Sequence, residues 1–576
     1  MATRFMGEEQ ALATEAKANL GRKKAALSPS SFCRPAWSWE LQLDFQCPGG
    51  KCPVKPPRAR HCGAKYSDDV PAVEGPIDPR RPPGTSRAGL GTLGTSLALA
   101  EGSFGARGNA NHWHALAVIG RIPCHHHRLA MRCPLGLWEA PPRRLTTACL
   151  IIIVIMDGKR NIVIVGGGII GCTTAYYLTR HPKFNPALHT ITLLEAAPTV
   201  AAGASGKAGG LLALWAYPSC LVPLSYKLHN ELATEHDGAQ KWGYRQLTCG
   251  SFEATVSKSR LDEMKKAKDE GKAWEKLPKQ DDAAKELLEP GALPQDLDWV
   301  DRDSISGWAE MGRPGTTATS QVHPLHFTRA IAELAQKAGV ELRTHAKVTK
   351  LVTSKTVVEK VEYQDRTTNE TREVRDVTDV IVTAGPWTGR LLPRAKVEGL
   401  RAHSVVYEAE VTPYAVFTDI QLPSNFVPDH RAKMGQRKMH KGSVDPEIYA
   451  RPFGEVYACG EPDTLIPLPE TADQVQFDEA QCDDIISYIA TISPVLATAP
   501  VKAKQACYLP RHMRFGQESG PLLGRTTVPG LWVAAGHTCW GIQNGPATGK
   551  LMSEYIFDGE ATSANVEKLD PRKFKV

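Results

Sequence analysis

The sequence predicts an α/β protein, α+β overall, in which a parallel-sheet domain is joined to a second, mostly antiparallel domain. Three observations lead to this prediction. IVIVGGGIIG at 162–171 and LWVAAGHTCWG at 531–541 each join an apolar run to closely spaced glycines, and a helix-like segment follows each of them. Between the two, residues 396–504 alternate short strand-like pieces with loops, which is typical of an antiparallel sheet.

The first quarter of the chain differs from the rest in composition. Residues 1–155 carry 20 Lys+Arg against 11 Asp+Glu, whereas the remaining residues carry 49 against 51. The first quarter is also rich in Pro, Gly and Arg and shows no sustained period, so we expect a mostly disordered extension. Met156 stands where an initiator would stand before the first strand, and 1–155 is then a dispensable extension or a gene-model artefact. The balanced remainder gives no reason to expect nucleic-acid binding.

The cysteines and the apolar runs indicate the compartment. Seven of the 14 cysteines follow Met156, and they are scattered singly, as in proteins of a reducing compartment. The run CLIIIVIM at 149–156 has eight residues, where a membrane span needs about 20. We therefore expect a cytoplasmic chain with no transmembrane segment, and we expect no metal site because the cysteine and histidine spacings match no closed zinc module.

The first glycine motif predicts a Rossmann-like dinucleotide site. Gly166 permits the tight turn after the strand, Gly168 lets the backbone approach a pyrophosphate, and Gly171 lets helix and strand pack closely. The phosphates then meet the helix N-terminus at Ile169 and Ile170.

An acidic residue at the end of the next strand supports the same site. TITLLEA places Glu195 24 residues past Gly171, where a carboxylate binds the ribose hydroxyls of an adenosine. A solvated carboxylate at a strand end remains the alternative.

Three further segments are expected to contact the nucleotide. VAAGASGKAGGLLA at 200–213 has side chains short enough for its backbone to lie against a flat ligand; the alternative is a flexible loop. ELRTHAKVTKLV and VTDVIVTAGPWTG predict two more strands. The residues expected at the cofactor from these segments are Ser205, Lys207, Gly209, Gly210, Val348, Ala384 and Gly385.

The second glycine motif indicates which nucleotide is bound. A strand at 531–534 leads into a turn with Gly536 and Gly541, and a helix begins near Gly545-Pro546. A nicotinamide dehydrogenase needs no such element at the far end of the chain, whereas a flavin ring needs a close backbone and the positive end of a helix. We therefore predict FAD, with Ile542 and Gln543 beside it. A NAD-dependent dehydrogenase is the alternative.

These two ends, together with GASGKAGG and DVIVTAGPW, resemble the D-amino-acid oxidase/glycine oxidase/sarcosine oxidase (DAO) family of FAD-dependent oxidoreductases over about 156–560. The resemblance implies a glutathione-reductase-like FAD domain. It implies oxidation of the C–N bond of an amino acid or secondary amine by hydride transfer to flavin, with oxygen or another electron acceptor. The branch most similar overall is a fungal group, which implies an alternative: a flavoprotein with vestigial catalysis that serves binding or endosomal trafficking.

Two positions depart from the family pattern. The family commonly has an arginine before the proline of the strand preceding the signature, where it binds the substrate carboxylate; here Leu509 precedes Pro510, and Arg511 follows. Sarcosine oxidases attach flavin through a cysteine two residues before the tyrosine of this strand, and Ala506 holds that place here. We therefore expect non-covalent FAD, and the binding of a substrate carboxylate is open.

The domain bounds follow from these assignments. We expect an FAD-binding domain at 156–226, 322–395 and 505–560, a substrate domain at 227–321 and 396–504, and a tail at 561–576. For the substrate pocket, the candidates beside the flavin or on the opposite wall are Trp540, Gln543, Tyr449, Arg451 and Arg511. The alternative is that Trp540 packs in the core and both arginines lie on the surface.

Overall fold

The computed structural model describes residues 158–269, 292–315, 319–354, 357–438 and 442–576. It confirms the α/β class, with a parallel sheet and a larger, mostly antiparallel sheet. The extension predicted at 1–155 lies outside the described residues.

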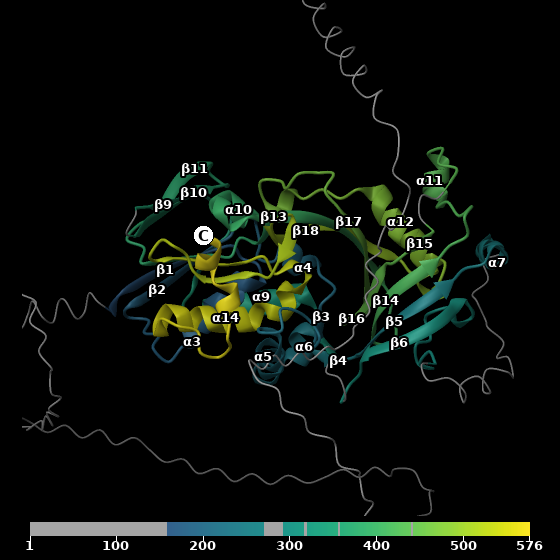
Figure 1. Cartoon of the computed structure of the whole chain (residues 1–576), viewed down its shortest axis with the longest axis horizontal. Coiled ribbons are helices and arrows are strands. Elements are labelled where there is room, and N and C mark those ends of the chain that lie inside the picture. The colour runs from purple at the N-terminus through teal and green to yellow at the C-terminus, as the bar shows by residue number, and fades with distance from the viewer. Residues whose placement is uncertain (1–157, 270–291, 316–318, 355–356, 439–441) are drawn as a thin grey trace, which may run out of the picture. The chain divides into compact units, whose positions relative to one another are not determined.

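A six-stranded sheet brings three distant segments of the chain together (Figure 1). Its order is β20-β21-β12-β1-β2-β8, and all neighbours are parallel except β20 and β21. The central strand β1 is buried from Ile162 to Val165, because helices cover one face of the sheet and strands β9 (Ala346–Thr353) and β10 (Val358–Asp365) of a smaller sheet pack on the other. The strands are β1 (Arg160–Val165), β2 (His189–Leu194), β8 (Glu341–Arg343), β12 (Asp379–Val382), β20 (Leu522–Arg525) and β21 (Leu531–Ala535).

Helix α14 (Gly541–Asp558) lies alongside α3 (Ile169–Arg180), as Figure 1 shows in yellow and blue. Two glycines of α14 allow this contact. A Cβ at Gly549 would lie 2.5 Å from the carbonyl carbon of Thr173, and the Thr173 hydroxyl donates a hydrogen bond of 2.8 Å to the Gly545 carbonyl oxygen. The helices that follow the two glycine motifs are therefore packed backbone to backbone.

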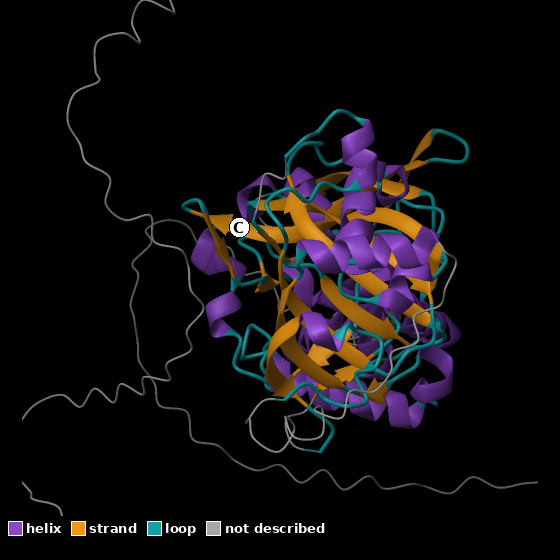
Figure 2. Cartoon of the chain, turned by 90° about the vertical axis from the view of Figure 1, so that its right-hand side faces the viewer, coloured by secondary structure: helices purple, strands orange, loops and turns teal. Residues whose placement is uncertain are grey.

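A nine-stranded sheet forms the second layer, in the order β19-β18-β13-β17-β16-β14-β5-β6 with β15 beside β14. Its pairs are antiparallel except β14 with β5. Apolar side chains on one face pack with α12 (Glu479–Ala490) and α13 (Pro494–Thr498), and Figure 2 shows helices lying across the strands. The strands are β5 (Thr248–Thr255), β6 (Ile305–Gly312), β13 (Val397–Glu408), β14 (Tyr414–Gln421), β15 (Ser443–Val444), β16 (Glu447–Arg451), β17 (Glu455–Asp463), β18 (Val501–Arg514) and β19 (Gln517–Ser519).

Two three-stranded sheets and several helices complete the described part. One small sheet has the order β11-β10-β9, and the other has the order β3-β7-β4. No helix among the described residues is both long and apolar enough to cross a membrane. The remaining elements are β3 (Leu211–Ala213), β4 (Arg245–Gln246), β7 (Thr319–Gln321), β9 (Ala346–Thr353), β10 (Val358–Asp365), β11 (Glu370–Val374), α4 (Ala204–Lys207), α5 (Val222–Glu235), α6 (Gly238–Trp242), α7 (Lys258–Asp269), α9 (Pro324–Lys337), α10 (Thr388–Leu391) and α11 (Asp429–Lys433).

The domain bounds stay a prediction, and several elements do not follow them, among them α6 and β18. Helix α6 lies in the segment assigned to the substrate domain, yet its Trp242 is buried in the same core as α3 and α14. Strand β18 begins at Val501, before the expected boundary at 505, and belongs to the nine-stranded sheet.

We predict that Gly549→Ala destabilises the protein by about 1–3 kcal/mol, because the added methyl group meets backbone atoms of α3 that cannot move aside. Thermal unfolding measures the effect as a lower Tm. The matched control is Gly307→Ala on β6, where an added Cβ meets nothing within 4 Å. Equal Tm values for the two variants would contradict the backbone contact between α14 and α3.

Candidate functional site

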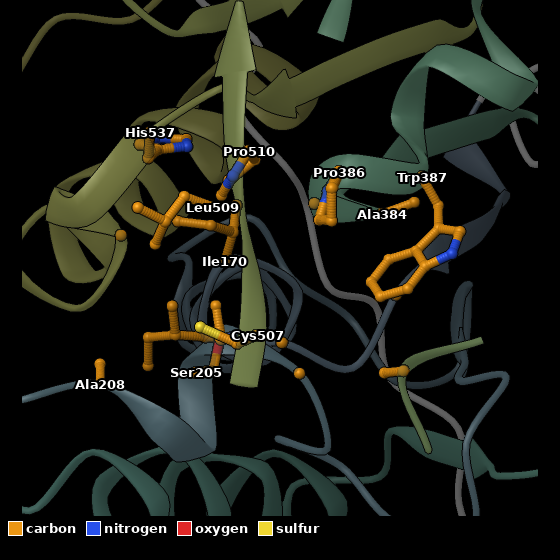
Figure 3. A pocket seen from close by; sticks show the side chains of 18 of the residues that line it. Ile170, Ser205, Ala208, Ala384, Pro386, Trp387, Cys507, Leu509, Pro510 and His537 are labelled. Carbon is orange, nitrogen blue, oxygen red and sulfur yellow. The ribbon is translucent and has the colours of Figure 1, made fainter. Parts of the chain in front are cut away.

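One cavity of about 660 Å³ is lined by both large sheets and the loops around them. The parallel sheet contributes the ends of β1, β2, β12 and β21, and the antiparallel sheet contributes residues of β13, β14, β16, β17 and β18. Figure 3 shows Cys507, Leu509 and Pro510 following one another along β18, with Pro386 and Trp387 across from them in that view. The cavity therefore lies where parallel strands end, which is where α/β sheets bind ligands.

The first glycine turn forms one wall because no side chain fits there. Gly166 has φ +110°, and a Cβ on it would lie 2.7 Å from the Thr383 carbonyl oxygen. A Cβ on Gly171 would lie 2.0 Å from the Gly166 carbonyl oxygen. The turn from β1 into α3 thus needs glycine at both positions, and Gly166, Gly168, Ile169 and Ile170 line the cavity.

Glu195 directly follows β2 at the cavity and is held by backbone groups. The Gly167 and Ala197 amides donate hydrogen bonds of 2.6 and 2.7 Å to its two carboxylate oxygens. Burial raises the pKa of Glu195, while these backbone bonds oppose the rise. The carboxylate is thereby oriented along the wall that Gly168 and Ala196 share.

The cavity's cationic residues lie on the side of β9 and α10. Lys347 and Arg390 line it there. The Lys347 ammonium lies 2.6 Å from one Glu470 carboxylate oxygen, and a guanidinium nitrogen of Arg390 lies 3.2 Å from the other. Val348, Ala384 and Gly385 line the same region. No other lysine or arginine is found among the described residues that line the cavity.

The second glycine turn joins β21 to α14 on the opposite side. Gly536 has φ +89° and Thr538 has φ +51°. His537 is buried, its Nε2 lies 3.0 Å from the Thr548 hydroxyl, and burial lowers its pKa to about 4. His537 is therefore neutral near pH 7, and the turn presents Gly541 and Ile542 to the cavity.

The antiparallel sheet supplies a third wall from residues paired across three strands. Phe417, Glu447 and Cys459 stand opposite one another on β14, β16 and β17. Tyr449 and Tyr457 form the next row on the same face, and their rings stack with centroids 5.9 Å apart. We call this wall together with Trp540 the Glu447 end of the cavity: Phe417, Glu447, Tyr449, Tyr457, Cys459 and Trp540.

The cavity gathers most of the residues predicted from the sequence for the cofactor. The lining ones are Gly166, Gly168, Ile169, Ile170, Glu195, Ser205, Gly209, Gly210, Val348, Ala384, Gly385, Gly536, Gly541 and Ile542. Gly171, Lys207 and Gln543 are not among the lining residues. The Lys207 ammonium donates to the Ala506 carbonyl oxygen at 3.0 Å, and Gln543 Oε1 accepts from the Ala213 amide at 2.8 Å.

The candidates for the substrate wall divide in the same way. Tyr449 and Trp540 line the cavity, but Arg451 and Arg511 do not. Arg451 bonds the Glu455 carboxylate, which stands opposite it on β17, and donates to the Ala208 carbonyl oxygen at 3.1 Å. Arg511 donates to Glu398 at 3.0 Å. Both guanidinium groups therefore have carboxylate partners away from the lining.

Sequence reasoning missed three of the lining residues at the Glu447 end: Phe417, Glu447 and Cys459. The alternation in EIYAR and EVYAC puts Glu447 with Tyr449 on one face, and Tyr457 with Cys459 on one face. That signal was available. The register that places the two pairs side by side was not, because it depends on pairing between strands.

Comparisons with known proteins assign the chain to a family. The model of the FAD-dependent oxidoreductase family (DAO) matches residues 161–555. "Putative oxidoreductase TDA3" of Saccharomyces cerevisiae is 35% identical over 507 residues, which cover 70% of this chain and 93% of that protein. "Putative oxidoreductase C1F5.03c" of Schizosaccharomyces pombe is 35% identical over 423 residues, covering 70% and 95%.

Solved structures of low identity resemble the chain as well. Glycine oxidase from Bacillus cereus has a TM-score of 0.48 at 18% identity, covering 70% of this chain and 99% of that one. L-proline dehydrogenase from P. horikoshii has a TM-score of 0.49 at 16% identity, covering 72% and 98%. The family match and the two fungal relatives confirm the resemblance seen in the glycine motifs: the chain belongs to the DAO family of FAD-dependent oxidoreductases.

Proposed function

We propose that this FAD-dependent oxidoreductase oxidises the C–N bond of a small amine or amino-acid-like substrate, with oxygen or another oxidant as the final electron acceptor. The observation that carries the proposal is the single cavity in which cofactor-type turns and a polar, aromatic wall meet. A substrate held against Tyr449 and Trp540 would share that cavity with a flavin ring beside Gly541.

The residues present fit an FAD. The glycine turns at Gly166 and Gly536 leave backbone where a Cβ would clash, at 2.7 Å from Thr383 and 2.9 Å from His512. In the proposal, Glu195 binds the ribose hydroxyls, the turn from Gly166 to Ile170 binds the pyrophosphate, and the N-terminus of α14 faces the ring. When bound, FAD supplies the hydride acceptor.

The attachment that fits these residues is non-covalent. Ala506 occupies the place that the covalent pattern would need. Cys507 does line the cavity, but burial raises its pKa to about 11 despite the nearby Lys207 ammonium. A thiol with that pKa is protonated near pH 7 and is a poor nucleophile.

The chain's own part in the reaction is to orient the substrate and keep water out. Leu509 and Pro510 of β18 and the rings of Phe417 and Trp540 give the cavity apolar surfaces. Burial raises the pKa of Tyr449 well above its usual value, so its hydroxyl stays protonated and donates to Glu447. The two arginines expected opposite the flavin take no part in this proposal, because their partners are Glu455 and Glu398.

Anaerobic reduction tests the proposal. Purified full-length protein is mixed with a panel of amines and amino acids, and the flavin absorbance is followed. Bleaching by at least one compound supports C–N oxidation. Bleaching by none would contradict it and would favour a flavoprotein that serves binding or trafficking. The cytoplasmic or endosomal location stays a prediction, which imaging of the tagged chain would check.

Replacing Glu195 tests the cofactor assignment. Glu195→Ala removes the acceptor of two backbone amides and the proposed ribose ligand. Losing such hydrogen bonds costs about 1–3 kcal/mol of free energy. We expect FAD affinity to fall about tenfold or more, measured as the flavin-to-protein ratio after dialysis. Glu341→Ala on the neighbouring strand is the control, since its side chain bonds Arg343 away from the cavity lining. Equal flavin retention in both variants would contradict the role given to Glu195.

Replacing Trp540 separates the two halves of the site. Its ring meets Trp215 and Tyr217 edge to face, with centroids 5.4 and 5.9 Å apart. We expect Trp540→Ala to change turnover or the flavin spectrum while FAD stays bound, because the first glycine turn and Glu195 hold the other half. Phe515→Ala, at a fully exposed aromatic residue, is the control. Unchanged turnover and spectrum, or loss of the flavin, would contradict this placement.

A further inference from the structure

We infer that the substrate is a monocationic amine without a carboxylate group, and that its ammonium binds the Glu447 carboxylate. This inference rests on the proposed function and narrows its substrate class. It follows from the Glu447 end of the cavity, which carries an acidic side chain, aromatic rings and, among its residues, no cation.

Strand register fixes Glu447 in the wall. Glu447 pairs with Phe417 on β14 and with Cys459 on β17. Side chains two residues apart share a face, so Glu447 and Tyr449 point the same way from β16. The opposite face of these strands is apolar and packs on α12, with Ile448, Val416 and Ala458 in that core. Glu447 is therefore directed to the cavity side of the sheet.

The Glu447 carboxylate has donors but no counter-cation. Its Oε2 atom accepts hydrogen bonds from the Tyr449 hydroxyl and from the Cys459 thiol, the latter at 3.6 Å. Among the described residues, no lysine, arginine or histidine nitrogen lies within 4.0 Å of its oxygens. Burial raises the pKa of Glu447, the hydrogen bonds from Tyr449 and Cys459 oppose that rise, and the nearby Asp445 charge adds to it. A desolvated carboxylate of this kind is stabilised by an incoming cation.

A substrate carboxylate would find no cationic partner among the residues of the Glu447 end of the cavity. Leu509 stands before Pro510, at the position where the family commonly has an arginine. Lys347 and Arg390 line the cavity on β9 and α10 and are paired with Glu470. A carboxylate beside Glu447 would add a like charge in a partly desolvated place, which is unfavourable.

The aromatic side chains suit the same ligand. Tyr449 and Tyr457 stack in the wall, Phe417 meets Tyr449 edge to face at 6.0 Å, and Trp540 belongs to the same cluster. Ring faces attract ammonium and alkylated ammonium groups within about 6 Å. The apolar parts of an amine would pack on these rings while its nitrogen meets the carboxylate.

A matched pair of probes tests the inference on full-length, FAD-loaded protein. N-methylphenethylamine and N-methylphenylalanine have the same ring and the same secondary amine, and they differ by the carboxylate. Binding of each is measured under anaerobic conditions by calorimetry and by the shift of the flavin absorbance. We expect the amine to bind about tenfold tighter or more than the amino acid. Equal or tighter binding of the amino acid would overturn the inference, and so would binding of neither probe.

A variant assigns the preference to Glu447. Glu447→Gln keeps the size of the side chain and removes its charge, and we expect it to weaken binding of N-methylphenethylamine about tenfold or more at an unchanged flavin-to-protein ratio. The control is Glu253→Gln on β5, an exposed carboxylate of the same sheet outside the lining. Unchanged amine affinity in Glu447→Gln would overturn the inference. If that variant fails to fold, the comparison of the two probes on the unaltered protein still decides.

The same experiment separates this inference from the proposed function. Binding of the amine that depends on Glu447 but leaves the flavin oxidised would support the inference and contradict C–N oxidation. Reduction of the flavin by N-methylphenylalanine but not by N-methylphenethylamine would support C–N oxidation and overturn the inference.

Discussion

The contact between α14 and α3 is the constraint on which the rest of the structure depends. Gly545 and Gly549 let the last long helix lie against Ile169 and Thr173 of the first one. Because both helices start at glycine turns, this contact sets the two turns side by side although they are far apart in the sequence. Strand β12 between β1 and β21 completes the same arrangement. Both glycine turns therefore line one cavity.

The second constraint is electrostatic and concerns how charges are distributed around the cavity. Arg451 is paired with Glu455 and Arg511 with Glu398, while Lys347 and Arg390 share Glu470. Glu447 has none of opposite charge among the described residues. Paired charges near a cavity offer little to a ligand, whereas an uncompensated carboxylate favours a cation. Our proposal of an amine substrate without a carboxylate rests on this difference between Glu447 and the paired charges.

Local signals made much of the fold predictable. The β-branched run before Gly166 is a buried parallel strand, and the glycines at 166 and 171 sit where a Cβ would clash. Glu195 directly follows the last residue of the neighbouring strand β2. These signals are local because one strand, one turn and one helix determine them.

What could not be predicted depends on pairing over long distances. Arg451 shares a strand with Tyr449, yet the register places Glu455 opposite it and pairs its guanidinium with that carboxylate. The same register sets Phe417, Glu447 and Cys459 in one row. Gln543 follows the second glycine turn by two residues, but the helix turns its side chain toward β3. Sequence spacing gives a residue's place in its element and not its neighbours across elements.

Our central proposal is that three separated segments build one non-covalent FAD site. Acid precipitation of the protein tests this proposal. Full-length protein purified from cells is precipitated with acid, and the supernatant is analysed by absorbance and mass spectrometry. We expect yellow protein that releases intact FAD at about one molecule per chain. Colourless protein that binds NADH instead, or flavin that stays with the precipitated chain, would contradict it.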